Sequence, residues 1–132
     1  MICLDTTLLI DFLKNSPRAI KACDRVKHEV LVTTAVNIFE ILFGILRKKQ
    51  INYDKEINGL MKLINSLNIL NLDYKASVRA SEIASDLVKR GLQIESNDCL
   101  IAGILLANNC NGIITLDKGH FERIKGIKVE SY

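Results

Sequence analysis

The sequence predicts an α/β fold, a three-layer α/β/α sandwich around a mainly parallel sheet of about five strands. Short apolar runs typical of buried strands alternate along the chain with longer segments whose apolar residues recur at helical spacing. This alternation covers the chain without a repeat, a linker or a low-complexity tract. We therefore expect one domain over residues 1–132, with helices on both faces of the sheet.

Five apolar segments are expected to form the strands. They are short and rich in Ile, Val and Leu, which suits strands that are buried on both faces of a parallel sheet. The predicted strands are residues 1–4, 29–33, 68–72, 113–116 and 127–130.

The helices are predicted from apolar periodicity and from the residues at their ends. Pro17 suits a first helical turn, Thr34 is a favoured N-cap and Gly91 is a favoured stop. Ser96 is expected to cap the helix that follows it. The predicted helices span residues 6–14, 17–28, 35–49, 52–66, 76–90, 97–109 and 121–124.

The composition is that of an ordinary globular protein, with 48% hydrophobic and 25% charged residues. A net charge of +3 is too mild to predict nucleic-acid binding by itself. Aromatic residues make up 5% of the chain and tryptophan is absent, so base stacking is not expected to be the main means of binding single strands.

Cysteine usage and apolar runs bear on the compartment. The four cysteines form no CxxC pair, which favours buried free thiols in a reducing cytosol over a zinc site or disulfides. The longest apolar run, residues 99–107, is too short to cross a bilayer. Asp5 and Asp11 interrupt the N-terminal segment, where a signal peptide would need an apolar stretch. We expect a cytoplasmic protein with no membrane partner.

Four acidic residues carry the main functional signal. Two of them directly follow the apolar runs MICL and GIITL, and the other two interrupt segments that are otherwise almost wholly apolar. A buried carboxylate is costly unless something pairs with it, and acids at the carboxyl ends of parallel strands converge on one crevice. One divalent-cation site explains all four, since Mg²⁺ and Mn²⁺ prefer carboxylate and water oxygens. The candidate ligands are Asp5, Glu40, Asp98 and Asp117.

Three of these acids also have a structural alternative. Asp5 is placed to cap the helix that follows it, and Asp98 lies where a carboxylate stabilises the first helical turn. Asp117 is followed by Lys118 and Gly119, which together favour a turn.

Glu40 is harder to explain structurally, because its helix is apolar on nearly every side over residues 35–46. We expect that helix to be covered by the domain and by a partner subunit together, with Glu40 in the wall of the site. His120 follows Asp117 by three residues, and the pattern leaves its role open.

Taken in order, the segments LDTTLLIDFL, TTAVNIFEILFG, ESNDCLIAGILL and ITLDKGHFERI resemble the motifs of PIN-domain nucleases. The likeness is greatest to the VapC-type toxins of bacterial and archaeal toxin–antitoxin pairs, and it covers essentially the whole chain. It implies a PIN-like parallel sheet flanked by helices, RNA cleavage with Mg²⁺ or Mn²⁺, a homodimer and a cognate antitoxin that silences the enzyme near its site.

The same resemblance assigns roles to individual residues. Thr7 matches the small polar position that supports the first acid, and Leu116 stands where some relatives carry an additional polar residue. The fourth ligand position therefore depends on Asp117 alone, and the resemblance does not distinguish between one and two bound metal ions. By resemblance, the metal-binding catalytic acids are Asp5, Glu40, Asp98 and Asp117.

The sequence thus predicts a metal-dependent ribonuclease that acts as the toxin of a toxin–antitoxin pair. One alternative is a PIN-like domain that binds RNA or a protein partner without cleaving. The other is a phosphoreceiver-type signalling domain, for which Asp73 after the third predicted strand is the candidate phosphoacceptor. Against this second alternative, Asp5 lacks the adjacent acid that such a domain requires.

Overall fold

A five-stranded sheet runs through the part of the chain described by the computed structural model, residues 1–49 and 52–132. The strand order is β3-β2-β1-β4-β5, and all neighbouring strands in this described sheet are parallel. The strands are β1 (Ile2–Leu4), β2 (Leu31–Thr34), β3 (Asn68–Leu70), β4 (Gly112–Ile114) and β5 (Lys128–Glu130).

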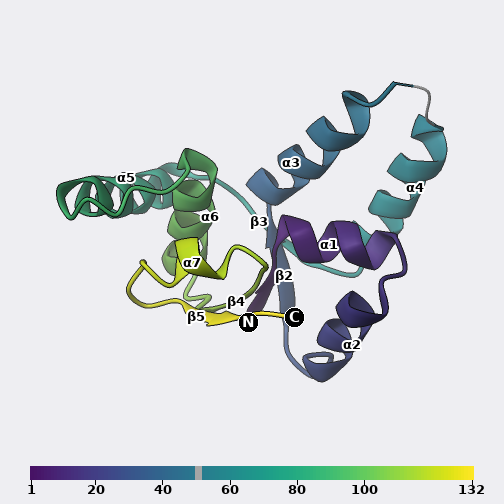
Figure 1. The fold of residues 1–132 in the computed structure, drawn as a ribbon, viewed down its shortest axis with the longest axis horizontal. Coiled ribbons are helices and arrows are strands. Elements are labelled where there is room, and N and C mark those ends of the chain that lie inside the picture. The colour runs from purple at the N-terminus through teal and green to yellow at the C-terminus, as the bar shows by residue number, and fades with distance from the viewer. Residues whose placement is uncertain (50–51) are drawn as a thin grey trace.

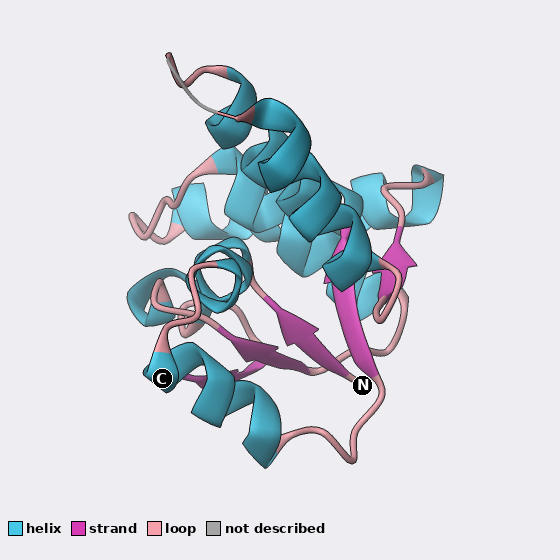
Figure 2. Ribbon diagram, turned by 90° about the vertical axis from the view of Figure 1, so that its right-hand side faces the viewer, coloured by secondary structure: helices cyan, strands magenta, loops and turns pink. Residues whose placement is uncertain are grey.

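Seven helices, counted within the same described residues, cover the sheet on both faces (Figures 1 and 2). The first four pack on one face and the last three on the other, which confirms the predicted three-layer architecture. None of these described helices has the length and apolar character needed to span a membrane. The helices are α1 (Thr6–Leu13), α2 (Pro17–Arg25), α3 (Ala35–Leu46), α4 (Tyr53–Ile64), α5 (Tyr74–Lys89), α6 (Ser96–Ala107) and α7 (Lys118–Phe121).

The short apolar strands supply side chains to two separate cores. On β1, Cys3 belongs to the core beneath α5 and α6, whereas Leu4 belongs to the core beneath α1 to α4. On β4, Ile113 and Ile114 divide in the same way. Because successive strand residues point to opposite faces, a strand covered on both sides must be apolar throughout. This explains why the strands appear in the sequence as continuous apolar runs.

The strand order reverses at β1, which lies between β2 and β4. The chain moves outward from β1 through β2 to β3, and then crosses back to β4 on the other side. In open parallel sheets, ligands bind in the crevice outside the carboxyl ends of the strands at such a reversal. The residues that follow β1, β2 and β4 therefore meet at one edge of the sheet.

The predicted helix starts at residues 6, 17 and 35 are confirmed, whereas α2 and α3 each end three residues earlier than predicted. Pro17 opens α2, and Thr34 caps α3 through a reciprocal capping box with Asn37. The predicted start of α5 at residue 76 is two residues too late, because the Asp73 carboxylate caps the helix and Tyr74 is its first residue. The helix ends before Gly91, whose positive φ of 67° is a conformation that glycine adopts without strain.

The prediction for the start of α6 is wrong by one residue. Glu95 occupies the N-cap position, and Ser96 is the first helical residue. Ser96 is therefore not the cap that its residue type predicted, and the Glu95 side chain makes no capping hydrogen bond either.

The prediction for the end of β4 is also wrong, because the strand stops at Ile114 and does not reach Leu116. The reason is the Thr115 hydroxyl, which accepts a hydrogen bond from the Asp117 amide at 2.9 Å and bends the chain. The short last helix consequently starts early. Asp117 is its N-cap, so Lys118 begins a helix rather than a turn.

Candidate active site

Asp5 is the buried centre of the site. It directly follows β1, and only 3% of it is exposed. Its Oδ1 accepts a hydrogen bond from Asn37 Nδ2 at 2.9 Å, and its Oδ2 accepts one from Thr115 Oγ1 at 2.6 Å. Although Asp5 occupies the N-cap position of α1, its side chain makes no capping hydrogen bond. The capping alternative therefore does not account for this carboxylate.

Glu40 is held by two neutral side chains. It lies on α3, one turn after Asn37, and is half-buried. The Thr6 hydroxyl donates a short hydrogen bond to Glu40 Oε2, and Asn97 Nδ2 donates to Oε1 at 3.1 Å. Thr6 begins α1 and Asn97 lies in the first turn of α6, so three separate helices meet at this carboxylate.

Asp98 lies beside Asn97 in the first turn of α6 and pairs with His120. The distance from Asp98 Oδ2 to His120 Nδ1 is 2.6 Å, and the side chains are 13% and 37% exposed, respectively. His120, which the sequence left without a role, thus lies at the site. Because Asp98 contacts His120 on α7, its carboxylate does more than stabilise the first turn of α6.

Asp117 is the exposed member of the group. It follows the bend at Thr115 and forms the N-cap of α7, but its side chain makes no capping hydrogen bond. Thr115 thus contacts two of the predicted acids, since its hydroxyl donates to the Asp5 carboxylate and accepts from the Asp117 amide.

The pKa values of two acids show that the group shares one electrostatic environment. The pKa of Asp5 is raised from 3.8 to about 6, mainly by burial and further by the charges of Asp98 and Glu40, while the Thr115 hydrogen bond opposes the shift. Burial also raises the pKa of Asp98. His120 opposes that shift, whereas Asp117 and Glu40 add to it. Asp5, Glu40 and Asp98 are therefore within electrostatic reach of one another, and Asp117 is within reach of Asp98.

The chemistry of these donors fits a hard divalent cation. Within the described residues, no three His, Cys, Asp or Glu side chains are gathered closely enough to form a ready metal site. Mg²⁺, however, is commonly held by one or two carboxylates with water as its other ligands. Burial is the main reason that the pKa values of Asp5 and Asp98 are raised, and a bound cation would stabilise the carboxylate charges that burial disfavours. Asp5 and Asp98, with water, are thus a suitable donor set.

The sequence missed several neutral residues at this site. It singled out Thr7, whose hydroxyl accepts a hydrogen bond from the Leu116 amide at 3.4 Å. The neighbouring Thr6 is the one that contacts Glu40. Thr6, Asn97 and Thr115 each lie within two residues of a predicted acid, and that adjacency was the only available signal.

The phosphoreceiver alternative does not fit the structure. Asp73 lies beyond the end of β3, which is an edge strand, and its carboxylate accepts the capping hydrogen bond of α5 from the Ala76 amide at 2.8 Å. An acid engaged in this way, away from the crevice beside β1, is a helix cap.

A family model described as "PIN domain" matches residues 2–127 of this chain. The chain belongs to the PIN-domain family. Among similar proteins, Ribonuclease VapC1 of Methanocaldococcus jannaschii is 31% identical over 131 residues, which cover 97% of this chain and 85% of that protein. The tRNA(fMet)-specific endonuclease VapC of Salmonella typhimurium is 24% identical over 129 residues, covering 98% and 96%.

Solved VapBC structures share the fold. VapBC2 from Rickettsia felis, bound to a DNA fragment from their promoter, matches with a TM-score of 0.87 at 21% identity, covering 100% of this chain and 99% of that one. VapBC-1 from nontypeable Haemophilus influenzae matches with a TM-score of 0.83 at 28% identity, covering 99% and 98%. This PIN domain is therefore of the VapC type, as the motifs predicted.

Proposed function

We propose that this VapC-type PIN domain is a divalent-metal-dependent endoribonuclease, and that it is the toxin of a toxin–antitoxin pair. The supporting observation is the group of four acids around the buried Asp5, at the sheet edge where ligands bind. Relatives named as ribonucleases match nearly the whole chain, so the domain that carries the acids is the one they share.

In this proposal Asp5 and Asp98 hold Mg²⁺ or Mn²⁺, with Glu40 and Asp117 close by. When bound, the ion activates water for attack on a phosphodiester and offsets charge on the phosphate oxygens. Asp5 is held immobile by its two hydrogen bonds, and Glu40 is held by two more. Asp117 is exposed, which places it where RNA can approach. No protein nucleophile is required, since water attacks the phosphorus.

Cleavage of a mixed pool of structured RNAs, with Mn²⁺ or with EDTA, tests this function. The wild type should cut only with Mn²⁺, and Asp98→Asn should lose the cutting while remaining folded. Glu95→Gln, which changes an exposed acid just before the same helix, should cut like the wild type. Cutting by Asp98→Asn or in EDTA at the wild-type rate would overturn the assignment.

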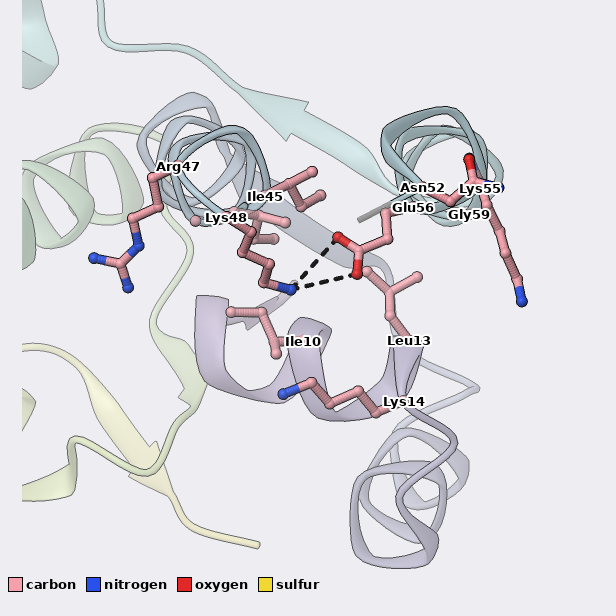
Figure 3. A pocket seen from close by; sticks show the side chains of 12 residues that line it. Ile10, Leu13, Lys14, Ile45, Arg47, Lys48, Asn52, Lys55, Glu56 and Gly59 are labelled. Atoms are coloured by element: carbon pink, nitrogen blue, oxygen red, sulfur yellow. Dashed lines mark hydrogen bonds and ion pairs between the residues drawn. The ribbon is translucent and has the colours of Figure 1, made fainter. Parts of the chain in front are cut away.

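We place the antitoxin in a groove of about 650 Å³ between α1, α3 and α4 (Figure 3). Its apolar lining comes from Ile10, Leu13, Ile41 and Ile45. Its basic side chains are Lys14, Arg47, Lys48 and Lys55. Among the described residues that line it, the one acid is Glu56, which pairs with Lys48 at 3.3 Å. An apolar segment of the antitoxin with acidic flanks complements this groove.

Gly44 offers a way to test the groove without disturbing the fold. It lines the groove on α3, and nothing lies within 4 Å of the position that a Cβ would take. The leucine of a Gly44→Leu variant should therefore occupy the groove. Affinity for the purified product of a small open reading frame just upstream should fall at least tenfold, with RNA cleavage retained. Unchanged affinity would exclude this groove as the antitoxin site.

A homodimer accounts for an exposed apolar stripe on α3. Phe39, Phe43 and Leu46 are 59%, 55% and 60% exposed, and the two rings stack with centroids 6.0 Å apart. Arg47 lies 5.6 Å from the centroid of Phe43. Such a contiguous apolar surface on a small domain is typical of an interface, and a second copy of this helix is its best complement.

A further inference from the structure

We propose that Asn37 is a positioning residue of the nuclease, which holds Asp5 and Glu40 in a fixed arrangement before the metal ion binds. The inference rests on the proposed function. Asn37 is fully buried in the first turn of α3, where an amide is unusual, and it lies beside two of the proposed catalytic acids.

One half of the Asn37 carboxamide is engaged with the end of β2. Its Oδ1 accepts hydrogen bonds from the Thr34 amide at 3.1 Å and from the Thr34 hydroxyl at 2.6 Å. The backbone N–H of Asn37 donates to Thr34 Oγ1 at 3.2 Å, which completes the cap of α3. This half anchors the side chain.

The other half of the carboxamide faces the acids. Nδ2 donates to Asp5 Oδ1 at 2.9 Å and to Thr6 Oγ1 at 3.0 Å. Thr6 in turn donates its hydroxyl proton to Glu40 Oε2. A primary amide has two donors and one oxygen acceptor, so each hydrogen-bonding atom of Asn37 is used. The single side chain thus joins an acid after β1 to an acid on α3.

No other residue type of this size does both tasks. Aspartate would keep the anchor to Thr34 but set a second carboxylate against Asp5, which is unfavourable in a buried site. Serine and threonine have a single donor proton, and leucine has none. A neutral amide both accepts from Thr34 and donates to an anion, which is why we assign Asn37 to the site and not merely to the helix cap.

Titration of the protein with Mn²⁺ alone, followed by calorimetry, tests this role. Asn37→Ala removes both the cap contact and the donors to Asp5 and Thr6, whereas Thr34→Ala removes only the hydroxyl of the cap and leaves the Thr34 backbone amide to hold Asn37 Oδ1. We expect Asn37→Ala to weaken Mn²⁺ binding about 10- to 100-fold, as loss of a group that orients a ligand does. Thr34→Ala should lose stability in urea yet bind Mn²⁺ within about twofold of the wild type.

A second pair of variants covers the case in which Asn37→Ala does not fold. Thr6→Val removes the hydroxyl that links Asn37 to Glu40, whereas Thr6→Ser retains it. Thr6→Val should weaken Mn²⁺ binding and lower kcat for RNA with KM unchanged, and Thr6→Ser should restore both.

The outcomes separate this inference from the function on which it rests. Wild-type Mn²⁺ affinity in Asn37→Ala and Thr6→Val, or an equal loss in Thr34→Ala, would show that Asn37 serves only the helix cap. If the wild type binds no Mn²⁺, or if Asp5→Asn leaves Mn²⁺ binding unchanged, the metal-dependent function itself is overturned.

Discussion

Replacing Asp5 by asparagine is expected to stabilise the metal-free protein at pH 8, although it removes a catalytic group. The pKa of Asp5 is about 6 in the folded protein against an ordinary value of 3.8, chiefly because the side chain is buried. A carboxyl group whose pKa is raised on folding binds its proton more tightly in the folded state. Its charge therefore destabilises the fold above pH 6, and this penalty disappears as the pH falls from about 6 toward 3.8.

The magnitude follows from that shift of roughly two pKa units. The penalty on the wild-type fold is about 3 kcal/mol at pH 8 and about 1 kcal/mol at pH 4.5. Asparagine retains one of the two side-chain oxygens, so the hydrogen bond from either Asn37 or Thr115 is lost, at about 1 kcal/mol. The net gain of Asp5→Asn is then about 2 kcal/mol at pH 8 and close to zero at pH 4.5.

Urea denaturation in EDTA at pH 4.5, 6 and 8 measures this difference in the free energy of unfolding. Asp24→Asn, a change to an exposed aspartate on α2, is the matched control and should stay within about 0.5 kcal/mol of the wild type at each pH. A difference between Asp5→Asn and the wild type that is equal at pH 4.5 and pH 8 would refute the reasoning, because it would mean that Asp5 ionises alike in both states.

Three further predictions concern packing, capping and assembly. Gly103→Ala should destabilise the protein by about 1–3 kcal/mol in urea, since its Cβ would lie 2.7 Å from the Ala76 carbonyl oxygen. Gly44→Ala should instead stabilise it by up to about 1 kcal/mol, because nothing lies within 4 Å of the added Cβ and alanine favours a helix over glycine. Asp73→Ala should lower stability by about 1 kcal/mol through the lost cap and leave RNA cleavage unchanged; loss of cleavage would give Asp73 a role in the site. Phe43→Glu should convert a dimer to a monomer in sedimentation experiments, and an unaltered mass would move the interface off α3.

The elements that the sequence predicted best are those determined by local interactions. The run Cys3–Leu4 fits a strand because both faces of the sheet are covered, and Thr34 caps α3 through a residue three positions away. The end of β4 was predicted less well. It depends on the Thr115 hydroxyl, which accepts from the Asp117 amide and at the same time donates to Asp5 at a separation of 110 residues, and no local pattern reveals that second contact.

The sequence by itself determined the fold class and the family, because alternating apolar strands and amphipathic helices and the order of the motifs stand out in a linear pattern, and it predicted the four acids as the site. Only the tertiary structure decided which neutral groups hold those acids. Asn37 reaches Asp5 across 32 residues and Asn97 reaches Glu40 across 57. It also decided that burial raises the pKa of Asp5 to about 6. These properties arise from long-range contacts and from exclusion of water, which exist only once the sheet has brought distant segments together.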